Sequence, residues 1–302
     1  MAETPPHRSG FVNILGNPNM GKSTLLNALV GERMSIITSK PQTTRHRIIG
    51  ILNDEESQIV FSDTPGFIED PAYRMHQVMN AYIHTSFEDA DLILYVTDPY
   101  ESLNDQYGLL KRISDHTAPV IAVINKKDLV TSEAMYKRIT ELSALLPGKT
   151  IHIVSALRND GLPELMKDIK ASIPEGPPFY PKDQLTDRPE RFFVSEIIRG
   201  KILELYHDEI PYTCEVNVDS FSEGDSRSGP LTRISATIYT MDDRKKSIIL
   251  GKGGTAIKQL GTDARKEIES FLDKRVFLEL VVKVRENWRD DDKSLRTFGY
   301  QN

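Results

Sequence analysis

A run of small and cationic residues near the N-terminus has the composition of a phosphate-binding loop. The segment Gly16-Asn17-Pro18-Asn19-Met20-Gly21-Lys22-Ser23, followed by Thr24, fits G-x4-G-K-[ST] at every fixed position. The glycines allow backbone N–H groups to approach phosphates closely, at a helix start that favours anions. Lys22 could then reach the β- and γ-phosphates of a nucleotide, and Ser23 could bind Mg²⁺. The alternative is a chance glycine-rich turn between a strand and a helix.

A second polar segment, Asp63-Thr64-Pro65-Gly66-Phe67, follows a long apolar run. An aspartate at the end of a buried strand suits a direct or water-mediated contact with Mg²⁺. The N–H of Gly66 could reach the γ-phosphate. Taken alone, Asp-Thr-Pro-Gly could equally be an ordinary turn after a strand.

Two further segments have the chemistry to recognise a base. Asn125-Lys126-Lys127-Asp128 follows an apolar strand, and its carboxylate can accept hydrogen bonds from the N1–H and N2 amino edge of guanine. Adenine lacks that edge, so Asp128 would separate GTP from ATP. Ser155-Ala156-Leu157 ends the last strand, where a backbone N–H can meet the guanine O6. Alone, each segment is a common kind of turn.

Together, these four motifs resemble the translation-factor-related GTPases of the P-loop class. They occur in the right order, each at the carboxyl end of an expected strand, where ligands of open α/β sheets bind. The resemblance implies that Lys40-Pro-Gln-Thr43-Thr44-Arg45 is the first switch, with a threonine closing over Mg²⁺ when the γ-phosphate is present. Families with Thr-Thr-Arg here favour Thr44 over Thr43, and a loop with solvated hydroxyls is the alternative.

Two residues depart from the Ras-type pattern and bear on hydrolysis. Phe67 stands where Ras-like enzymes place a water-orienting glutamine, and it cannot polarise water. Relatives with a hydrophobic residue there use asparagine at the position of Asn19 to help bind K⁺. We therefore expect slow hydrolysis that depends on Lys22, Thr44, Gly66 and Asn19, with K⁺ supplying the charge of an arginine finger. The alternative is that Asn19 only shapes the loop.

The elements that must position these residues alternate between strands and helices up to about residue 173. Buried strands are expected at Phe11–Leu15, Ile59–Ser62, Leu92–Thr97, Val120–Ile124 and Ile151–Val154, with helices around 22–31, 75–88, 104–116, 132–145 and 161–172. An antiparallel hairpin adds Ile48–Leu52. This pattern predicts an α/β domain with a mostly parallel six-stranded sheet and helices on both faces.

A proline-rich segment then interrupts every periodicity. Pro174-Glu-Gly-Pro-Pro-Phe-Tyr-Pro181 indicates a semi-rigid linker. We therefore predict a GTPase-like domain over residues 1–173, a linker over 174–187 and a second domain with a C-terminal tail over 188–302.

The second domain has the predicted order α-β-β-α-α-β. Helices are expected at Phe192–Tyr206, Lys246–Leu250 and Thr255–Leu272, and strands at Glu215–Phe221, Leu231–Thr240 and Val276–Val284, with a turn at Ser222–Gly229. A Gly-x-x-Gly loop between two helices is how a KH domain grips about four nucleotides of a single strand. This α+β part resembles a type II KH domain, although Gly-Lys-Gly-Gly alone is also an ordinary helix–helix turn.

The RNA-binding residues expected from this resemblance are a loop and a basic stripe, namely Arg244, Lys245, Lys246, Gly251, Lys252, Gly253, Gly254 and Lys258. The formal net charge of −6 argues against a nucleic-acid partner, but the acidity lies in the first part of the chain. From Arg188 to Asn302 there are 20 Lys and Arg against 20 Asp and Glu, so any basic surface there is local.

The amino-acid composition indicates the class of protein and its cellular location. The hydrophobic content of 39% and charged content of 27% are those of a soluble globular protein, and no apolar run reaches the roughly 20 residues that span a bilayer. We expect a cytoplasmic location, because Cys214 is the single cysteine and the N-terminus has no signal-peptide core.

The whole layout resembles the Era family of ribosome-assembly GTPases. The likeness includes Pro41–His46, Glu196-Ile-Ile-Arg199, Glu209-Ile-Pro-Tyr212, Gly251–Gly254 and the tail Glu286-Asn-Trp288-Arg. It implies a monomer that binds GTP or GDP with Mg²⁺ and binds the 3′ region of small-subunit (16S) rRNA to assist maturation of the 30S particle. It also implies peripheral contact with the inner face of the cell membrane.

Two other functions stay open. One is a GTPase component of another RNA-processing or RNA-modification pathway, although the relatives that modify tRNA carry a C-terminal cysteine motif. The other is a binding module that holds nucleotide as a structural ligand, against which the set Lys22, Ser23, Asp63 and Asp128 argues.

Overall fold

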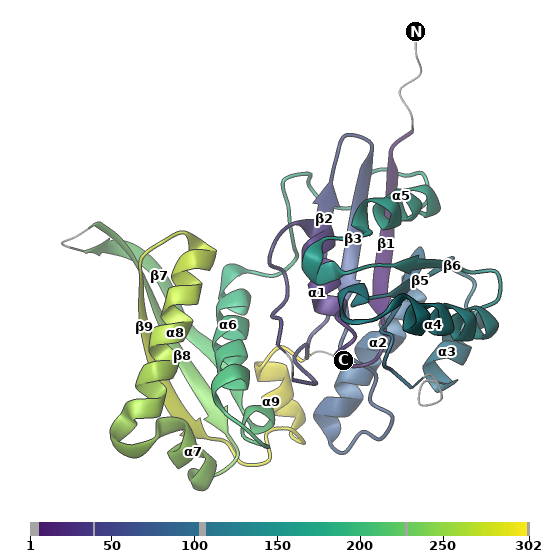
Figure 1. The fold of residues 1–302 in the computed structure, drawn as a ribbon. Coiled ribbons are helices and arrows are strands. Elements are labelled where there is room, and N and C mark those ends of the chain that lie inside the picture. The colour runs from purple at the N-terminus through teal and green to yellow at the C-terminus, as the bar shows by residue number, and fades with distance from the viewer. Residues whose placement is uncertain (1–5, 39, 103–106, 227–228, 301–302) are drawn as a thin grey trace. The chain divides into compact units, whose positions relative to one another are not determined.

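The computed structural model describes residues 6–38, 40–102, 107–226 and 229–300. The chain divides into two compact units (Figure 1). The first contains Met1–Ser35, Thr44–Pro71 and Met79–Asp187, and the second contains Ile36–Thr43, Ala72–Val78 and Arg188–Asn302. Two short segments, 36–43 and 72–78, thus belong to the second unit although the chain on either side belongs to the first. The domain limits given above stay a prediction.

The first unit is built on a six-stranded sheet in the order β2-β3-β1-β4-β5-β6. The strands are β1 (Arg8–Leu15), β2 (Ile48–Asn53), β3 (Ser57–Asp63), β4 (Leu92–Thr97), β5 (Val120–Ile124) and β6 (Thr150–Ile153). The helices along this part of the chain are α1 (Lys22–Val30), α2 (Arg74–Glu88), α3 (Tyr107–Ser114), α4 (Ser132–Leu145) and α5 (Leu162–Ser172). All neighbouring strands are parallel except β2 and β3. The predicted parallel sheet with one antiparallel edge strand is confirmed.

Helices cover both faces of this sheet, which is why its strands read as continuous apolar runs. Leu15 points to the face where it shares a core with residues of α2, α3 and α4, such as Ile83, Ile113 and Leu142. Successive strand residues alternate, so Gly10 faces the other way. A Cβ placed on Gly10 would lie 2.8 Å from Ile173, just after α5, so α5 lies close to that face.

The segment predicted as a linker, residues 174–187, lies along the β2-β3-β1 side of the first unit. Its backbone accepts hydrogen bonds from the Gln58 amide at Tyr180 (2.8 Å) and from the Ile51 N–H at Leu185 (2.8 Å). The Gly176 N–H donates to His7 at 2.9 Å. The segment therefore packs on the sheet up to the boundary with the second unit at Asp187.

The second unit has a three-stranded sheet in the order β7-β8-β9. Its strands are β7 (Glu215–Ser226), β8 (Gly229–Thr240) and β9 (Val276–Val284), and its helices are α6 (Glu190–Leu205), α7 (Asp243–Leu250), α8 (Thr255–Leu272) and α9 (Asp292–Thr297). β7 is antiparallel to β8, and β9 is parallel to it. The predicted order α-β-β-α-α-β is present, with the bounds of α8 and β9 as predicted.

Two details of the second unit differ from the prediction. The residues predicted as a turn at Ser222–Gly229 mostly extend the hairpin, and pairing continues to Ser226 opposite Gly229. The tail also forms α9, which the sequence did not indicate. Both segments are polar, so their strand and helix patterns carry little hydrophobic signal.

One hydrophobic core joins the helices of the second unit to its sheet. It includes Ile198 of α6, Ile249 of α7, Ile268 of α8 and Ile234 of β8. The tail is anchored separately through fully buried Trp288, whose indole N–H donates to the Thr213 carbonyl at 3.0 Å. Over the residues that the structure describes, no helix combines the length and apolarity needed to cross a membrane.

Candidate functional site

Four predicted nucleotide-binding segments meet at one edge of the six-stranded sheet. Gly16–Gly21 follows β1, Thr64–Phe67 follows β3, Asn125–Asp128 follows β5, and Ser155–Leu157 comes just after β6. These strands are mutually parallel, so their carboxyl ends lie at the same edge. The sheet thereby brings together side chains that are up to about 140 residues apart in the chain.

Two glycines of the phosphate loop, and Gly66 beside it, lie where the structure leaves no room for a side chain. Gly21 has φ +87°, and a Cβ there would lie 2.3 Å from the Asn125 amide nitrogen. A Cβ on Gly16, at φ +149°, would lie 2.2 Å from the Val96 carbonyl oxygen. A Cβ on Gly66 would lie 2.5 Å from Pro18. Each position therefore admits only glycine if the loop is to keep this shape.

Lys22 begins α1 and lies under the loop. Its ammonium donates to the backbone oxygens of Gly16 (2.9 Å) and Asn17 (2.8 Å). Burial lowers the pKa of Lys22 to about 8, while the nearby charges of Asp63 and Glu101 raise it. A buried ammonium at a helix N-terminus is suited to bind the phosphates of a nucleotide.

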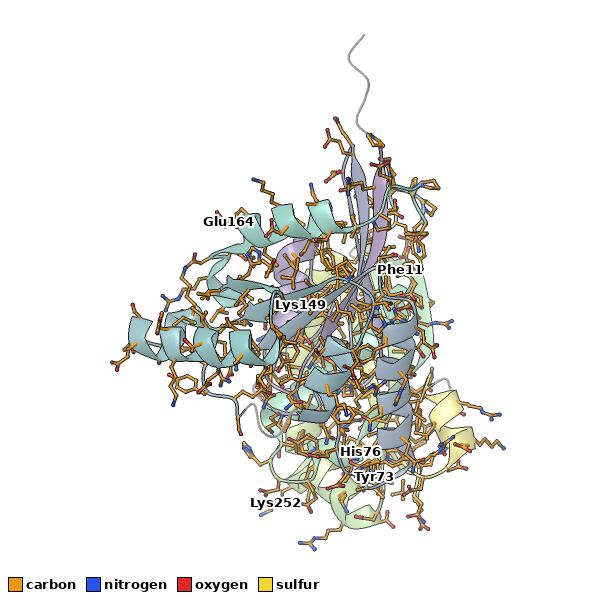
Figure 2. All side chains as sticks on the ribbon, turned by 90° about the vertical axis from the view of Figure 1, so that its right-hand side faces the viewer. Phe11, Tyr73, His76, Lys149, Glu164 and Lys252 are labelled. Atoms are coloured by element: carbon orange, nitrogen blue, oxygen red, sulfur yellow. The ribbon has the colours of Figure 1, made fainter. Side chains whose placement is uncertain are left out.

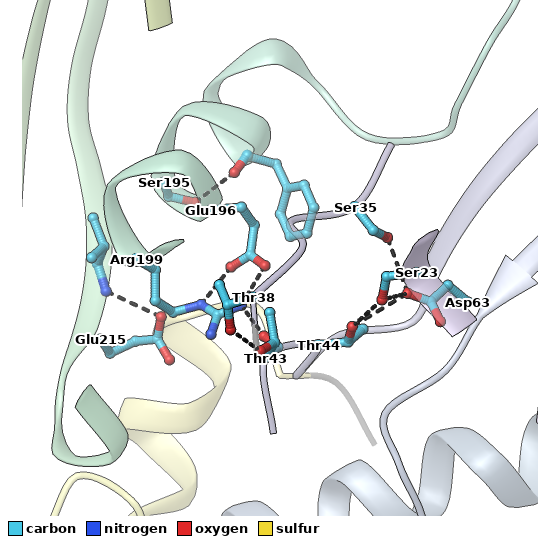
Figure 3. Close-up of polar contacts among 12 residues, drawn as sticks. Ser23, Ser35, Thr38, Thr43, Thr44, Asp63, Ser195, Glu196, Arg199 and Glu215 are labelled. Carbon is cyan, nitrogen blue, oxygen red and sulfur yellow. Dashed lines mark hydrogen bonds and ion pairs between the residues drawn. The ribbon is translucent and has the colours of Figure 1, made fainter. Parts of the chain in front are cut away.

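Three predicted magnesium ligands converge in the structure (Figure 3). The Ser23 hydroxyl donates to Asp63 Oδ2 at 2.6 Å and lies 2.8 Å from the Thr44 hydroxyl. Thr44 also donates to Asp63 Oδ2, at 3.3 Å. A residue that no motif indicated joins them, since Ser35 donates to the same oxygen at 3.1 Å. One carboxylate oxygen thus accepts from three hydroxyl groups.

This cluster fits Mg²⁺. The other Asp63 oxygen, Oδ1, is buried and has no hydrogen-bond partner within the described part of the chain. Burial raises the pKa of Asp63, against the lowering effect of Lys22 and of the three hydroxyls. A cation would compensate the buried carboxylate, and hard oxygen ligands of this kind are those that Mg²⁺ takes.

The structure separates the two threonines of the first switch. Thr43 belongs to the second unit, and its hydroxyl donates to the Lys40 carbonyl and lies close to Thr38 Oγ1, each at 2.7 Å. Thr44 belongs to the first unit and contributes to the cluster with Ser23. The position of the hydroxyls therefore favours Thr44 over Thr43 as the switch residue.

The segments after β5 and β6, which were predicted to bind the base, are joined by hydrogen bonds. Asp128 accepts from the Ser155 hydroxyl at 2.6 Å, and this hydrogen bond is the main cause that lowers the pKa of Asp128. Asn125 accepts from the Ala156 N–H at 3.0 Å and donates to the Met20 carbonyl at 3.1 Å. Asn125 thus joins the phosphate loop to both segments.

The remaining residues of these segments lie around the same edge. Lys126 donates to the Asn19 carbonyl at 2.6 Å and to Asp98 at 2.8 Å, a contact that the motifs did not indicate. Lys127 pairs with Asp160 at 2.7 Å. Thr64 donates to the Ile14 carbonyl at 3.0 Å. Leu157 is 76% exposed.

The structure also shows the surroundings of Phe67 and Asn19, the two residues that depart from the Ras-type pattern. Phe67 is partly buried and packs against the core shared by α2, α3 and α4. It therefore stabilises the segment after β3 by packing. Asn19 of the phosphate loop is exposed and has φ +67°, a left-handed conformation that asparagine tolerates better than most residues.

The Gly-x-x-Gly loop of the second unit joins α7 to α8. Gly251, Gly253 and Gly254 all have positive φ angles, of +71°, +61° and +77°. Beside Gly253 and Gly254, no heavy atom of the described residues lies within 4 Å of an added Cβ, so a ligand backbone can approach there. Lys252, which lies between Gly251 and Gly253, is exposed (Figure 2).

The basic residues around this loop are not equivalent. Arg244 and Lys258 are exposed on α7 and α8, and Lys246 is half-buried. Lys245 pairs with Asp242 at 2.5 Å, and Asp242 also caps the N-terminus of α7 by accepting from the Lys245 N–H. Asp242 therefore partly neutralises the charge of Lys245.

Both parts of the chain match known protein families. Residues 11–126 match a family described as 50S ribosome-binding GTPase, and residues 209–289 match the KH domain family. The curated protein GTPase Era of Geotalea uraniireducens (strain Rf4) is 45% identical over 295 residues, covering 97% of this chain and 98% of that protein. GTPase Era of Xylella fastidiosa (strain M12) is 39% identical over all of both chains.

Two solved structures are similar over nearly the whole chain. A single-residue variant of Aquifex aeolicus Era, bound to GDP and AlF4⁻, has a TM-score of 0.90 at 37% identity, covering 98% of this chain and all of that one. Era in complex with MgGDPNP and nucleotides 1506–1542 of 16S ribosomal RNA has a TM-score of 0.92 at 37% identity, with the same coverage.

Proposed function

The chain belongs to the Era family of GTPases, and we propose that it is a GTP-controlled switch that binds the 3′ region of 16S rRNA and assists 30S subunit maturation. The chain is a GTPase that uses Mg²⁺. The observation that carries the proposal is the convergence of Ser23, Thr44 and Asp63 within 3.3 Å in a chain that also presents a Gly-x-x-Gly loop. The first feature senses the γ-phosphate, and the second binds a nucleic-acid backbone.

Nucleotide binding divides between the two ends of the site. The phosphates are bound by backbone N–H groups of Gly16–Gly21 and by the ammonium group of Lys22. Thr24, which was also predicted to bind the nucleotide, follows Ser23 in α1. Asp128 and the Ala156 N–H bind the guanine, with Ser155 holding the carboxylate in place. Ser23, Thr44 and Asp63 hold Mg²⁺, which neutralises phosphate charge when bound.

Hydrolysis proceeds without a glutamine beside the γ-phosphate, so the intrinsic rate is slow. The Gly66 N–H contacts the γ-phosphate, and Thr44 orders the switch around it. Asn19, which is exposed in the phosphate loop, would help to bind K⁺, and this cation would supply positive charge where other GTPases use an arginine finger. The left-handed backbone conformation of Asn19 supports a specific role for this residue in the loop.

RNA binding rests on the loop between α7 and α8. Gly251, Gly253 and Gly254 allow a phosphodiester backbone to approach, and Lys252 adds a cation within the loop. Arg244, Lys246 and Lys258 extend the positive charge, with a smaller share for Lys245 because Asp242 pairs with it.

We also propose that the protein is a monomer in the cytoplasm and makes peripheral contact with the inner face of the cell membrane. This part of the proposal rests on the family resemblance. The alternative is a GTPase component of another RNA-processing or RNA-modification pathway. The single cysteine, Cys214, is fully buried and thus unlike the cysteine motif of the tRNA-modifying relatives.

The proposal is tested by binding of a 3′-terminal 16S rRNA oligonucleotide, measured by fluorescence anisotropy. With a non-hydrolysable GTP analogue we expect at least about ten-fold tighter binding than with GDP, because only the triphosphate orders the switch. Lys22→Ala should abolish this difference and GTP turnover. Equal affinity in both nucleotide states, or normal turnover by Lys22→Ala, would overturn the proposal.

A further inference from the structure

One residue of the Asp63 cluster belongs to none of the nucleotide-binding motifs. Ser35 is 3% exposed, and its hydroxyl donates to Asp63 Oδ2 at 3.1 Å (Figure 3). The same oxygen accepts from Ser23 at 2.6 Å and from Thr44 at 3.3 Å. All four residues belong to the first unit. The cluster therefore contains one hydrogen-bond donor more than the motifs account for.

Helix α1 holds Ser35 in place through the side chain of Asn27. The side-chain oxygen of Asn27 accepts from the N–H groups of Met34 and Ser35, each at 2.9 Å. Its amide nitrogen donates to the Ser35 carbonyl at 2.8 Å. Gly31 ends α1 with a left-handed φ of +81°, and the turn after it brings residues 34 and 35 back to the helix. One side chain thus fixes the backbone from which the Ser35 hydroxyl extends.

The same helix also supplies Ser23. Ser23 and Asn27 are four residues apart in α1, so they lie on the same face of the helix. Helix α1 therefore positions two donors to Asp63. Ser23 donates directly, and Asn27 holds the loop from which Ser35 donates.

Thr44 differs from Ser35 in how it is held. Thr44 lies in the segment that the family resemblance identifies as the first switch, and switch segments are released when the γ-phosphate is lost. Ser35 is tied to α1, which begins directly after the phosphate loop. The hydrogen bond from Ser35 to Asp63 should therefore persist in both nucleotide states.

We propose that Ser35 is a positioning residue of the magnesium site, which holds the Asp63 carboxylate with either GTP or GDP bound. Because Oδ2 is held, the direction of Oδ1 is also set, and Oδ1 is buried without a hydrogen-bond partner among the described residues. A carboxylate that is already oriented loses less freedom when it binds a cation. The inference rests on the magnesium ligands of the proposed function and adds a residue that sets their affinity.

The test uses the full chain, loaded with a fluorescent analogue of GDP or of non-hydrolysable GTP. Ser35→Ala removes only the hydroxyl. The matched control is Ser86→Ala, because Ser86 is also a fully buried serine of the first unit, but its hydroxyl donates to the Tyr82 carbonyl at 2.8 Å within α2. Thr44→Ala provides the contrast with a residue of the switch.

The measurement is the Mg²⁺ concentration that half-maximally slows release of the nucleotide. We expect Ser35→Ala to raise it at least about ten-fold with both nucleotides, as is typical when a hydrogen-bond partner of a metal ligand is removed. Thr44→Ala should raise it only with the GTP analogue. Without Mg²⁺, Ser35→Ala should release GDP as the parent does. Ser86→Ala should keep the parent's Mg²⁺ requirement even if its Tm falls equally.

Asn27→Asp tests whether Asn27 acts through Ser35. This variant keeps the oxygen that accepts from the two N–H groups but loses the donor to the Ser35 carbonyl, so we expect a smaller rise in the Mg²⁺ requirement. Combined with Ser35→Ala, it should add no further rise, because the hydroxyl through which Asn27 acts is already absent. Additive rises would overturn this part of the inference.

A parental Mg²⁺ requirement in folded Ser35→Ala would overturn the inference, and so would a rise confined to the GTP analogue or an equal rise in Ser86→Ala. If Ser35→Ala does not fold, Asn27→Asp decides by the same measurement. Asp63→Ala separates this failure from that of the proposed function. A parental Mg²⁺ requirement in Asp63→Ala would refute the proposed magnesium site itself, whereas a rise there with none in Ser35→Ala would refute only the role of Ser35.

Discussion

The Ser155 hydroxyl donates to the Asp128 carboxylate at 2.6 Å and thereby joins the loops after β5 and β6. This hydrogen bond is the main cause that lowers the pKa of Asp128, and it fixes the position of one carboxylate oxygen. A base that presents two donors, as guanine does, is therefore matched by a group that is already oriented.

Asp128→Asn tests this acceptor. The amide donates where the carboxylate accepts, so we expect GTP affinity to fall by about 100-fold or more, since hydrogen bonds to a charged group are lost. Xanthosine triphosphate, which has a carbonyl in place of the guanine amino group, should bind the variant better than GTP does. The measurement is competition between the two nucleotides, and unchanged preference for GTP would show that another residue reads the base.

Gly21→Ala tests the approach of the phosphate loop to Asn125. A Cβ at Gly21 would lie 2.3 Å from the amide nitrogen of Asn125, so the loop or the Asn125 side chain that joins it to the base-binding segments must shift, and we expect GTP and GDP binding to be lost. Gly31→Ala is the matched control, because Gly31 has a similar φ of +81° but open space around its Cβ.

The Gly31 variant should lose only about 1–2 kcal/mol of stability, the cost of a left-handed conformation for alanine, and should bind nucleotide normally. Isothermal titration calorimetry and thermal unfolding separate these effects. Normal GTP affinity in Gly21→Ala would contradict the loop geometry.

The proposed potassium contact predicts a dependence of turnover on the monovalent cation. GTP hydrolysis should be faster in K⁺ than in Na⁺ at equal ionic strength, because the ionic radius decides which cation fits. Asn19→Ala should remove this difference while leaving the Kd for GDP near that of the parent. Identical rates of the parent protein in the two salts would end the potassium proposal.

Lys252→Ala tests the RNA-binding loop. Loss of one phosphate contact should weaken RNA binding uniformly across sequences and reduce the slope of log affinity against log salt by about 1. Lys274→Ala is the control, because Lys274 is also an exposed lysine but lies beyond the other end of α8, paired with Glu223. An equal loss in both variants would indicate a diffuse charge effect in place of a contact at the loop.

The sequence predicted the elements that bury regular hydrophobic patterns. The bounds of α8 and β9 were predicted correctly, because Leu260, Ala264 and Ile268 recur at helical spacing and Val276–Val284 alternates. It missed α9, a six-residue polar helix whose buried anchor is Leu295. A possible signal was Asp291, which caps α9 by accepting from the Ser294 N–H at 2.8 Å.

The sequence predicted the residues of the candidate site that belong to motifs with fixed spacing. It did not predict contacts made by residues outside such motifs. Ser23 and Asp63 could be paired because each belongs to a motif at a strand end. Ser35 joins them only because the Asn27 side chain holds its backbone, through hydrogen bonds of 2.8 and 2.9 Å. The contact of Arg199 with Thr43 spans 156 residues and depends on tertiary packing, which no local pattern contains.

The most direct test of a GTP-controlled RNA-binding switch is crosslinking of the protein to RNA in cell extract, followed by sequencing. The protein is loaded either with a non-hydrolysable GTP analogue or with GDP, and the RNA bound in each state is compared. We predict enrichment of the 3′ region of 16S rRNA in the GTP-analogue state and little in the GDP state. Equal recovery of unrelated RNAs in both states would contradict the account.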